Sequence, residues 1–335
     1  MRILLLTPRI SGVGGIAQHV RQLARRLRRS GHDARILSSE TMRLQLRKGA
    51  ANAGYAALAA LKALSGSFDI VHGHNLPAAI PAGIAKAKAR VMTMHGVYWR
   101  QIRLLYGRLL GGAARLAERE LLSGMDAVTT VTLEAMKYYR SLDLRVKYIP
   151  NAIDLSELPR NGERISSPQI TYLGRLSREK GVDLLVEAAL RGLKGLVVAG
   201  EGPLRPSVER AARKGLLKFL GALPRWKALR ILAGSDVAIL PSREEGVSTV
   251  LLEAMALRIP VVATRVSGTI EVVRNGRDAV LVDPRAEELA EAAERLLEDR
   301  DYAEMLAENA YERVLSAFNW DIVQEAYLKL YESLL

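Results

Sequence analysis

Short apolar runs typical of buried strands alternate with helical patterns along the whole chain. In the first half these runs are Ile3–Leu6, Ala34–Leu37, Asp69–His72, Arg90–Met94, Asp126–Val131 and Val146–Ile149. The second half continues with Gln169–Leu173, Gly195–Ala199, Asp236–Leu240, Pro260–Ala263 and Ala279–Val282. Because a strand, a helix and a second strand join most readily into a parallel sheet with helices on both faces, the alternation predicts an α/β fold.

The chain of 335 residues is long enough for two such domains, at roughly 150 residues per domain. The polar stretch Asp154–Pro168 is the expected boundary. We therefore expect an N-terminal domain over 1–153 and a C-terminal domain over 154–317, both doubly wound. The tail, Phe318–Leu335, reads as an amphipathic helix that crosses back onto the first domain. Two such domains would face each other across a cleft lined by the carboxyl ends of their strands, where folds of this kind bind ligands.

Composition excludes several classes of site. The chain has no cysteine, which excludes a disulfide scaffold, a thiolate zinc site, an iron–sulfur cluster and a cysteine nucleophile. With only five histidines we expect no metal centre. No apolar run reaches the roughly 18–20 residues of a membrane-spanning helix, and no secretory signal is visible. The expected location is the cytoplasm.

Basic charge is concentrated in the first half. Residues 1–150 hold 24 Lys and Arg against 8 Asp and Glu, a net charge of +16, whereas residues 151–335 carry −3. Arg21, Arg25 and Arg28 share one side of an expected helix, and Arg108, Arg115 and Arg119 form a similar stripe on a helix over Trp99–Leu122. The excess indicates an anionic partner or a solvated arginine-rich surface. The lack of basic segments interleaved with aromatic residues argues against nucleic acid.

Two segments of the first half have the features of a ligand site. Gly12-Val13-Gly14-Gly15 lies between the first strand and a helix, where glycines let the backbone approach a phosphate or simply form a tight turn. Its partial match to a dinucleotide-binding loop leaves a nicotinamide-dependent oxidoreductase as an alternative. His95 follows the strand Arg90–Met94, and His72 and His74 follow an earlier strand. Each could contact a ligand or be a structural hydrogen-bonded residue.

The second half carries stronger signals after two of its strands. The loop Gly174–Gly181 contains Arg175 and Lys180, two cations that suit a diphosphate. After Asp236–Leu240, Glu245 and Gly246 form a turn, and Ser248 or Thr249 can cap the helix that follows. Glu253 lies in an apolar part of that helix, so its carboxylate needs a partner, either ribose hydroxyls or a buried cation.

These segments together resemble the retaining glycosyltransferases of family 4, which have the GT-B fold of two Rossmann-like domains. The resemblance covers nearly the whole chain in order: Gly14–Val20, Thr93–Gly96, Ile149–Asp154, Gly174–Gly181, Val198–Pro203, and Glu245 with Glu253, followed by Ala254-Met255-Ala256 and Pro260–Thr264. The chain departs from the family at Val247 and Ser248, where Phe-Gly is frequent, and at Ala152 and Val266–Thr269. These departures bear on donor identity more than on the reaction.

The resemblance implies transfer of a sugar, with retained configuration, from a UDP- or GDP-sugar to an acceptor that is lipid-linked, a saccharide or a small molecule. The first domain would bind the acceptor and the second the donor. Arg175 and Lys180 would hold the diphosphate, Glu253 the ribose, and Glu245 and His95 the transferred sugar. Gly14, Gly15, Gly246, Val247, Ser248 and Thr249 would supply backbone contacts to the ligands. No metal or other cofactor is implied. A nucleotide-sugar epimerase of the same fold is the alternative reaction, and peripheral binding to an anionic membrane would explain the basic half.

Overall fold

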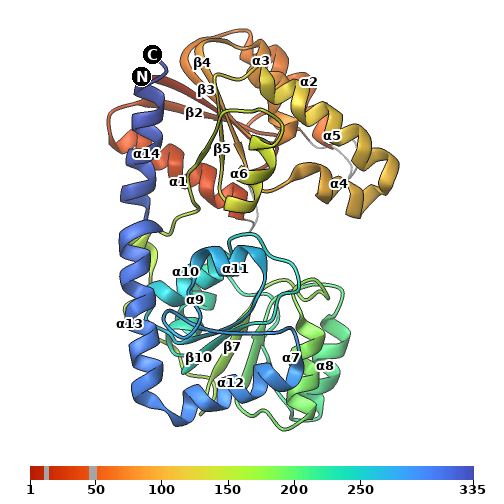
Figure 1. Cartoon of the computed structure of the whole chain (residues 1–335), viewed down its shortest axis with the longest axis vertical. Helices are drawn as coiled ribbons and strands as arrows, with labels where there is room; N and C mark the ends of the chain where they lie inside the picture. Colours follow the sequence, from red (N-terminus) through yellow and green to blue (C-terminus); the bar gives the residue numbers. More distant parts are fainter. Residues whose placement is uncertain (11–14, 45–50) are drawn as a thin grey trace. The chain divides into compact units, whose positions relative to one another are not determined.

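The computed structural model describes residues 1–10, 15–44 and 51–335, and these residues form two compact units (Figure 1). Unit 1 contains Met1–Asn151 and Trp320–Leu335, and unit 2 contains Ala152–Asn319. The limits lie within two residues of those expected from the sequence. The binding roles assigned to the two units stay predictions.

Unit 1 is built on a six-stranded parallel sheet in the order β2-β1-β3-β4-β5-β6. The strands are β1 (Arg2–Leu6), β2 (Asp33–Leu37), β3 (Ser67–His74), β4 (Lys86–Met94), β5 (Ala127–Thr130) and β6 (Val146–Tyr148). The strand order changes direction between β1 and β3, because β2 lies on one side of β1 and all later strands lie on the other. A doubly wound sheet binds its ligand at such a point.

Helices cover both faces of the unit 1 sheet. They are α1 (Gly15–Arg29), α2 (Ala51–Ala63), α3 (Ala79–Ile84), α4 (Tyr98–Tyr106), α5 (Arg108–Ser123), α6 (Leu133–Arg140) and α14 (Trp320–Glu332), with a 3₁₀ turn at Leu76–Ala78. Residues of α2, α3, α5 and α6 share one apolar cluster with Leu4, Leu6 and Val71 of the sheet. Tyr331 and Tyr327 of α14 instead contact His72 and Thr93, and His19 of α1 contacts Tyr327. His72 and Thr93 alternate with the residues of that cluster and so point to the other face.

The helix expected over Trp99–Leu122 is in fact two helices. Gly107 separates α4 from α5 with a φ of 89°, a value that side chains other than glycine rarely allow. Gly111 then packs against Arg103 of α4, where a Cβ atom would come within 2.6 Å of the arginine Cβ. The expectation of one continuous helix was wrong because Gly107 breaks the chain direction.

Unit 2 repeats the architecture with the sheet order β12-β11-β10-β7-β8-β9. Its strands are β7 (Ile170–Leu173), β8 (Leu196–Ala199), β9 (Lys218–Phe219), β10 (Val237–Leu240), β11 (Val261–Thr264) and β12 (Val280–Val282). All neighbouring strands are parallel. The direction of strand order changes between β7 and β10, which carry the two strongest sequence motifs at their carboxyl ends.

The helices of unit 2 are α7 (Val182–Leu190), α8 (Arg205–Arg213), α9 (Arg225–Ala233), α10 (Thr249–Ala256), α11 (Ser267–Val272), α12 (Ala286–Glu298) and α13 (Arg300–Ala317), with a 3₁₀ turn at Leu155–Glu157. One apolar cluster joins α7, α8 and α12 to the sheet, and a second joins α9, α10 and α13. Two elements, β9 and α11, were not expected from the sequence, since both are short. The two doubly wound units confirm the predicted fold class.

In the part of the chain that the structure describes, no helix is both long enough and apolar enough to cross a membrane.

Candidate functional site

The strongest site candidates meet at the carboxyl ends of β7 and β10 in unit 2. Arg175 and Lys180 lie in the loop after β7, and Glu245 and Ser248 lie in the loop after β10. Because β7 and β10 are hydrogen-bonded neighbours, the two loops leave the sheet side by side. The fold therefore brings together residues that are 65 positions apart in the chain.

Lys180 and Glu245 form an ion pair in this site. The Lys180 Nζ donates to Glu245 Oε1 and Oε2, each at 2.6 Å, and Ser242 Oγ donates to Glu245 Oε2 at 3.1 Å. Both charged side chains are partly buried. Arg175 is more open, with its side chain 63% exposed and its guanidinium 3.6 Å from Glu179. The arrangement presents one cation free to reorient and one cation already held by a carboxylate.

Glycines let the loops of the site pack against one another. Gly181 has a φ of 67°, and a Cβ atom there would lie 1.9 Å from the carbonyl oxygen of Pro241. A Cβ atom on Gly268 would lie 1.8 Å from the carbonyl oxygen of Gly246. Gly181 therefore packs against the neighbouring loop, and a ligand is not needed to explain the glycine at this position.

The helix α10 begins at the site with a capped amino end. Ser248 Oγ accepts a hydrogen bond from the backbone N–H of Leu251 at 3.4 Å, and Thr249 is the first helical residue. Of the two caps that the sequence allowed, Ser248 is the one used. Val247 is buried. The other amides of this first turn lack intrahelical partners, which makes the segment a suitable place for an anion.

Glu253 is buried in α10 and pairs with an arginine from α9. Its side chain is 4% exposed, and Arg225 Nη1 donates to Glu253 Oε1. Burial raises the pKa of Glu253, and the positive charge of Arg225 opposes that rise. The cation that the sequence left open as a partner of this carboxylate is therefore present, as the partly buried Arg225. No described residue hydrogen-bonds Glu253 Oε2, so this oxygen is available to a ligand hydroxyl.

Two residues of the site were not predicted from the sequence. Arg225 carries no motif, since its pairing with Glu253 depends on how α9 packs against α10. Arg243 forms a two-pronged ion pair with Asp183, at 2.7 and 2.9 Å, and also donates to the carbonyl oxygen of Arg178 at 2.8 Å. This arginine fastens the loop after β10 to the loop after β7. The sequence signal was its position inside the motif beside Glu245.

In unit 1, the predicted ligand-binding loop is only partly described. Gly14 lies outside the described residues, and Gly15 is the first residue of α1. His95 follows β4 at the carboxyl edge of the sheet, where its backbone N–H donates to Asn75 Oδ1 at 2.9 Å. Asn75 has a φ of 62° and follows β3 directly. The position of His95 is thus fixed by the adjacent strand end.

Four of the five histidines form one cluster inside unit 1. His74 Nδ1 and His95 Nε2 lie 3.2 Å apart, and the rings of His72 and His74 stack with centroids 4.3 Å apart. His72 contacts Tyr331 Oη and Thr93 Oγ1 at 2.7 and 2.6 Å. His19 contacts Tyr327 Oη at 3.2 Å. Residues of the C-terminal helix α14 therefore complete the hydrogen bonding of the cluster.

Burial keeps these histidines neutral. It lowers the pKa of His19 to about 4 and that of His72 to about 3. It also holds the pKa values of His74 and His95 well below the ordinary value, with the neighbouring histidines adding repulsion. His95 is thus a neutral hydrogen-bonding group in this structure. His74 Nε2 is buried and has no hydrogen-bond partner among the described residues.

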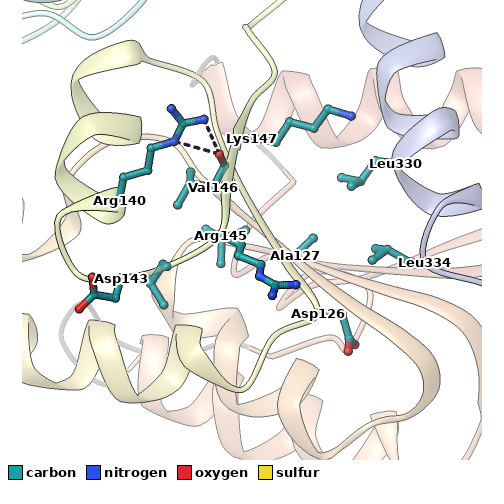
Figure 2. Close-up of a pocket in the computed structure, with 11 residues that line it drawn as sticks. Asp126, Ala127, Arg140, Asp143, Arg145, Val146, Lys147, Leu330 and Leu334 are labelled. Atoms are coloured by element: carbon teal, nitrogen blue, oxygen red, sulfur yellow. Dashed lines mark hydrogen bonds between the residues drawn. The ribbon is translucent and has the colours of Figure 1, made fainter.

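The pocket in Figure 2 lies elsewhere in unit 1 and contains none of the predicted site residues. It has a volume of about 640 Å³ and opens where β5 and β6 begin, beside Leu330 and Leu334 near the end of the chain. Arg140, which donates to the carbonyl oxygen of Val146, and Lys147 belong to its lining (Figure 2). Its position, away from the carboxyl ends of the strands, separates it from the motif residues.

Asp299 and Asp301 have the spacing of an Asp-x-Asp metal-binding motif, but Asp299 caps a helix instead. Asp299, in Asp299-Arg300-Asp301, accepts a hydrogen bond from the backbone N–H of Tyr302 at 3.0 Å and caps α13. Within residues 1–10, 15–44 and 51–335 no group of three or more His, Cys, Asp or Glu side chains is placed to hold a metal ion.

Comparison with known proteins identifies the family. The family described as Glycosyltransferase Family 4 matches residues 13–157, and the family described as Glycosyl transferases group 1 matches residues 167–299. The chain is 30% identical to an alpha-maltose-1-phosphate synthase of Mycolicibacterium smegmatis over 304 residues, covering 78% of each protein.

Solved structures share the fold at lower identity. The sucrose-phosphate synthase of Thermosynechococcus elongatus has a TM-score of 0.83 at 20% identity and covers 99% of this chain and 98% of its own. HepE of Anabaena, solved with UDP-glucose, has a TM-score of 0.79 at 19% identity and covers 99% of this chain and 100% of its own. The chain belongs to the family 4 glycosyltransferases, enzymes of the transferase class with the GT-B fold.

Proposed function

We propose that this enzyme transfers a sugar from a nucleoside diphosphate sugar, with retention of configuration, and that unit 2 binds the donor. The observation that carries the proposal is the pairing of loops at the change of strand order. Arg175 and Lys180 after β7 lie beside the capped amino end of α10 after β10. Two cations and a set of free helix amides match the charge of a diphosphate.

The donor would be held by four groups. Arg175, exposed and weakly paired, reaches the diphosphate without breaking a strong contact. Lys180 reaches it by releasing or sharing Glu245. Glu253 Oε2 accepts from the ribose hydroxyls while Oε1 stays on Arg225. Glu245, once Lys180 turns to the diphosphate, accepts from hydroxyls of the transferred sugar. Gly246, Val247, Ser248 and Thr249 supply backbone contacts.

In the reaction, the bond between the sugar anomeric carbon and the diphosphate oxygen breaks, and a bond from the same carbon to the acceptor oxygen forms. The leaving diphosphate gains negative charge, which Arg175, Lys180 and the amides of α10 stabilise as it develops. Attack from the side of the leaving group retains the configuration, and the departing phosphate oxygen takes the acceptor proton. The solved HepE complex contains UDP-glucose, which supports a UDP-sugar as the first donor to test. A GDP-sugar is the other donor class.

Unit 1 would contribute the acceptor side. Gly15 begins α1 at the change of strand order, and the neutral His95 offers a hydrogen-bonding ring at the carboxyl edge of the same sheet. The net charge of +16 over residues 1–150 supports an acceptor that is anionic or lipid-linked.

The first-formed anomer of the released sugar tests the reaction class. Without an acceptor a glycosyltransferase can transfer the sugar to water. Proton NMR of a UDP-glucose or GDP-mannose digest then reports the first-formed anomer, provided that the enzyme concentration is high enough to release sugar faster than it mutarotates. Release of the α-anomer from an α-linked donor is expected. Release of the β-anomer would contradict retention. Conversion of the nucleotide sugar to an isomeric nucleotide sugar would instead identify an epimerase.

A further inference from the structure

Unit 1 exposes a group of large apolar side chains on neighbouring helices. Nine large apolar side chains of unit 1 are exposed among the described residues, and seven of them lie on α2, α3 and α5 or directly after α2: Leu61, Leu64, Ile80, Ile84, Leu109, Leu110 and Leu116. These helices contact one another, α2 with α3 and α3 with α5, as Figure 1 shows on the upper right. We call this surface the α2–α3–α5 face.

The leucines of α5 point outward because the opposite side of the helix is anchored. Glu118 is buried and accepts hydrogen bonds from Tyr138 Oη, Tyr139 Oη and the backbone N–H of Trp99, at 3.1, 3.0 and 2.9 Å. Leu122 belongs to the core. The outward side then carries Leu109, 92% exposed, and Leu116, 75% exposed, two turns apart on one stripe.

Cations flank these leucines along the helix. Arg108, Arg115 and Arg119 repeat at the same helical spacing and form the adjoining stripe. Arg115 lies over the ring of Trp99, whereas Arg108 and Arg119 have no ion-pair partner among the described residues. The arginines of α1 differ, since Arg21 donates to the carbonyl oxygen of Ile10 and Arg28 to that of Ala34. The unpaired cations are thus placed next to the exposed leucines.

We infer that the α2–α3–α5 face docks on an anionic lipid bilayer, with Leu109 and Leu116 entering the headgroup region and Arg108 and Arg119 contacting lipid phosphates. Two observations favour an anionic bilayer. The exposed charged residues of α5 are three arginines, Arg108, Arg115 and Arg119, against one carboxylate, Glu120. Residues 1–150 as a whole carry +16. A helix with leucines on its outer side and arginines beside them is typical of interfacial binding.

The inference goes beyond the proposed function, because docking needs none of the residues assigned to the donor. Only the consequence of docking rests on the proposed function: the enzyme would reach its acceptor at a membrane surface. Docking and donor binding can therefore be measured separately on the same protein, and either can fail without the other.

Vesicle co-sedimentation of the full chain tests the docking. The vesicles are phosphatidylcholine alone or phosphatidylcholine with about one third phosphatidylglycerol, at about 0.05 M and about 0.5 M salt. Wild type is expected to bind the anionic vesicles, more weakly at high salt, and not the neutral ones. Arg108→Glu with Arg119→Glu should lower the partition coefficient at least about 25-fold, at about fivefold per basic residue lost. Leu109→Ser with Leu116→Ser should lower it at least about tenfold.

Two control variants match these changes elsewhere. Arg29→Glu with Lys147→Glu removes the same charge from exposed positions outside the face, and Leu190→Ser changes a leucine of unit 2 that is 61% exposed. Both variants should bind anionic vesicles as wild type does, apart from a small loss of affinity in the Arg29/Lys147 variant because its net charge is lower. Circular dichroism and donor binding, unchanged in every variant, show that the fold is intact.

Three results would overturn the inference. One is a wild-type protein that does not sediment with anionic vesicles. Another is an equal loss of binding in the Arg108/Arg119 and Arg29/Lys147 variants, which would reduce the effect to net charge. The third is a change from dimer to monomer in the leucine variant with vesicle binding unaltered, which would make the face a contact between copies.

Discussion

At the scale of single residues, the proposed donor site is a set of charged side chains that mostly have partners within unit 2. Lys180 is held by Glu245 and Glu253 by Arg225, while Arg175 has only a weak contact. A ligand must therefore compete for Lys180 but not for Arg175. The sequence could identify all four motif residues, because each follows a strand at a recognisable spacing. It could not identify Arg225, whose role comes from packing between two helices.

The Lys180–Glu245 pair predicts opposite effects of two substitutions. Glu245→Gln releases the Lys180 charge, so a free nucleoside diphosphate should bind about three- to tenfold more tightly, whereas sugar transfer should fall because the sugar hydroxyls lose a carboxylate. Lys180→Met should weaken both by about tenfold or more. Titration calorimetry with UDP and GDP, beside a transfer assay, measures the two effects. Unchanged diphosphate binding in Lys180→Met would exclude this lysine from the donor site.

The Arg225–Glu253 pair predicts a pH-dependent loss of stability. Arg225→Ala leaves the Glu253 carboxylate buried without its cation, which should lower the free energy of unfolding by about 2–4 kcal/mol near pH 7. The pKa of Glu253 is already raised by burial, and losing Arg225 raises it further. As pH falls, the folded variant takes up a proton and the cost shrinks.

Denaturant unfolding of wild type and Arg225→Ala at about pH 7.5 and about pH 5 measures this difference. Arg225→Ala with Glu253→Gln is the matched control, since a neutral amide at 253 should recover part of the loss and remove its pH dependence. A cost that grows as pH falls would contradict a buried, charged Glu253.

At the scale of elements, strand ends and loop contacts determine where the chemistry can occur. The sequence predicted every strand except β9, because runs such as Asp236–Leu240 are apolar and end in a motif. It did not predict the break at Gly107, since nothing in the sequence separates a glycine in a helix from one that ends it. Nor did it predict that Tyr327 and Tyr331 of α14 complete the histidine cluster, because that depends on how the tail lies against the sheet.

The histidine cluster predicts that unit 1 loses stability in mild acid. His19 and His72 have pKa values lowered to about 4 and about 3, against about 6.5 in the unfolded chain. Between these values the unfolded state binds more protons, so stability is full above about pH 6.5 and falls as pH drops, by up to about 2 kcal/mol per histidine at pH 5.

Thermal unfolding followed by calorimetry from about pH 7.5 to about pH 5 checks this slope. His72→Gln should reduce the pH dependence, although it also costs stability at neutral pH. His32→Gln is the matched control, because His32 lies outside the cluster and should leave most of the slope in place. A unit 1 transition that does not move with pH would mean that the cluster is already protonated or open to water.

The contact of α11 with the site loop predicts a large effect from one methyl group. In Gly268→Ala the new Cβ would come within 1.8 Å of the Gly246 carbonyl oxygen, so α11 or the loop must shift. We expect a loss of about 1–3 kcal/mol in unfolding free energy together with weaker donor binding. Gly112→Ala is the control, because a Cβ atom at this position in α5 would have no other atom within 4 Å. This substitution should leave the unfolding free energy unchanged or raise it. Equal behaviour of the two variants would contradict the tight contact.

At the scale of the whole molecule, two doubly wound units divide the work that the proposal assigns. Unit 2 contains the paired loops for the donor, and unit 1 contains His95, the amino end of α1 and the basic charge. The sequence predicted the limits of the two units to within two residues, since the boundary segment is polar, whereas the roles assigned to the units stay proposals. It predicted the arginine stripe of α5 but not the exposed leucines of the α2–α3–α5 face, because exposure of Leu109 and Leu116 follows only once α5 is anchored by Glu118.

The most direct test of the account is the affinity of the full chain for nucleoside diphosphate sugars, measured by titration calorimetry on wild type, Arg175→Ala and Arg178→Ala. Arg178 lies in the same loop with its side chain 83% exposed and 4.0 Å from Asp183, so it matches the change in charge. The account predicts that wild type binds a UDP- or GDP-sugar, that Arg175→Ala binds it about tenfold or more weakly, and that Arg178→Ala binds as wild type does. Binding of NAD alone, or equal affinity in all three proteins, would contradict the assignment of the donor to the loops after β7 and β10.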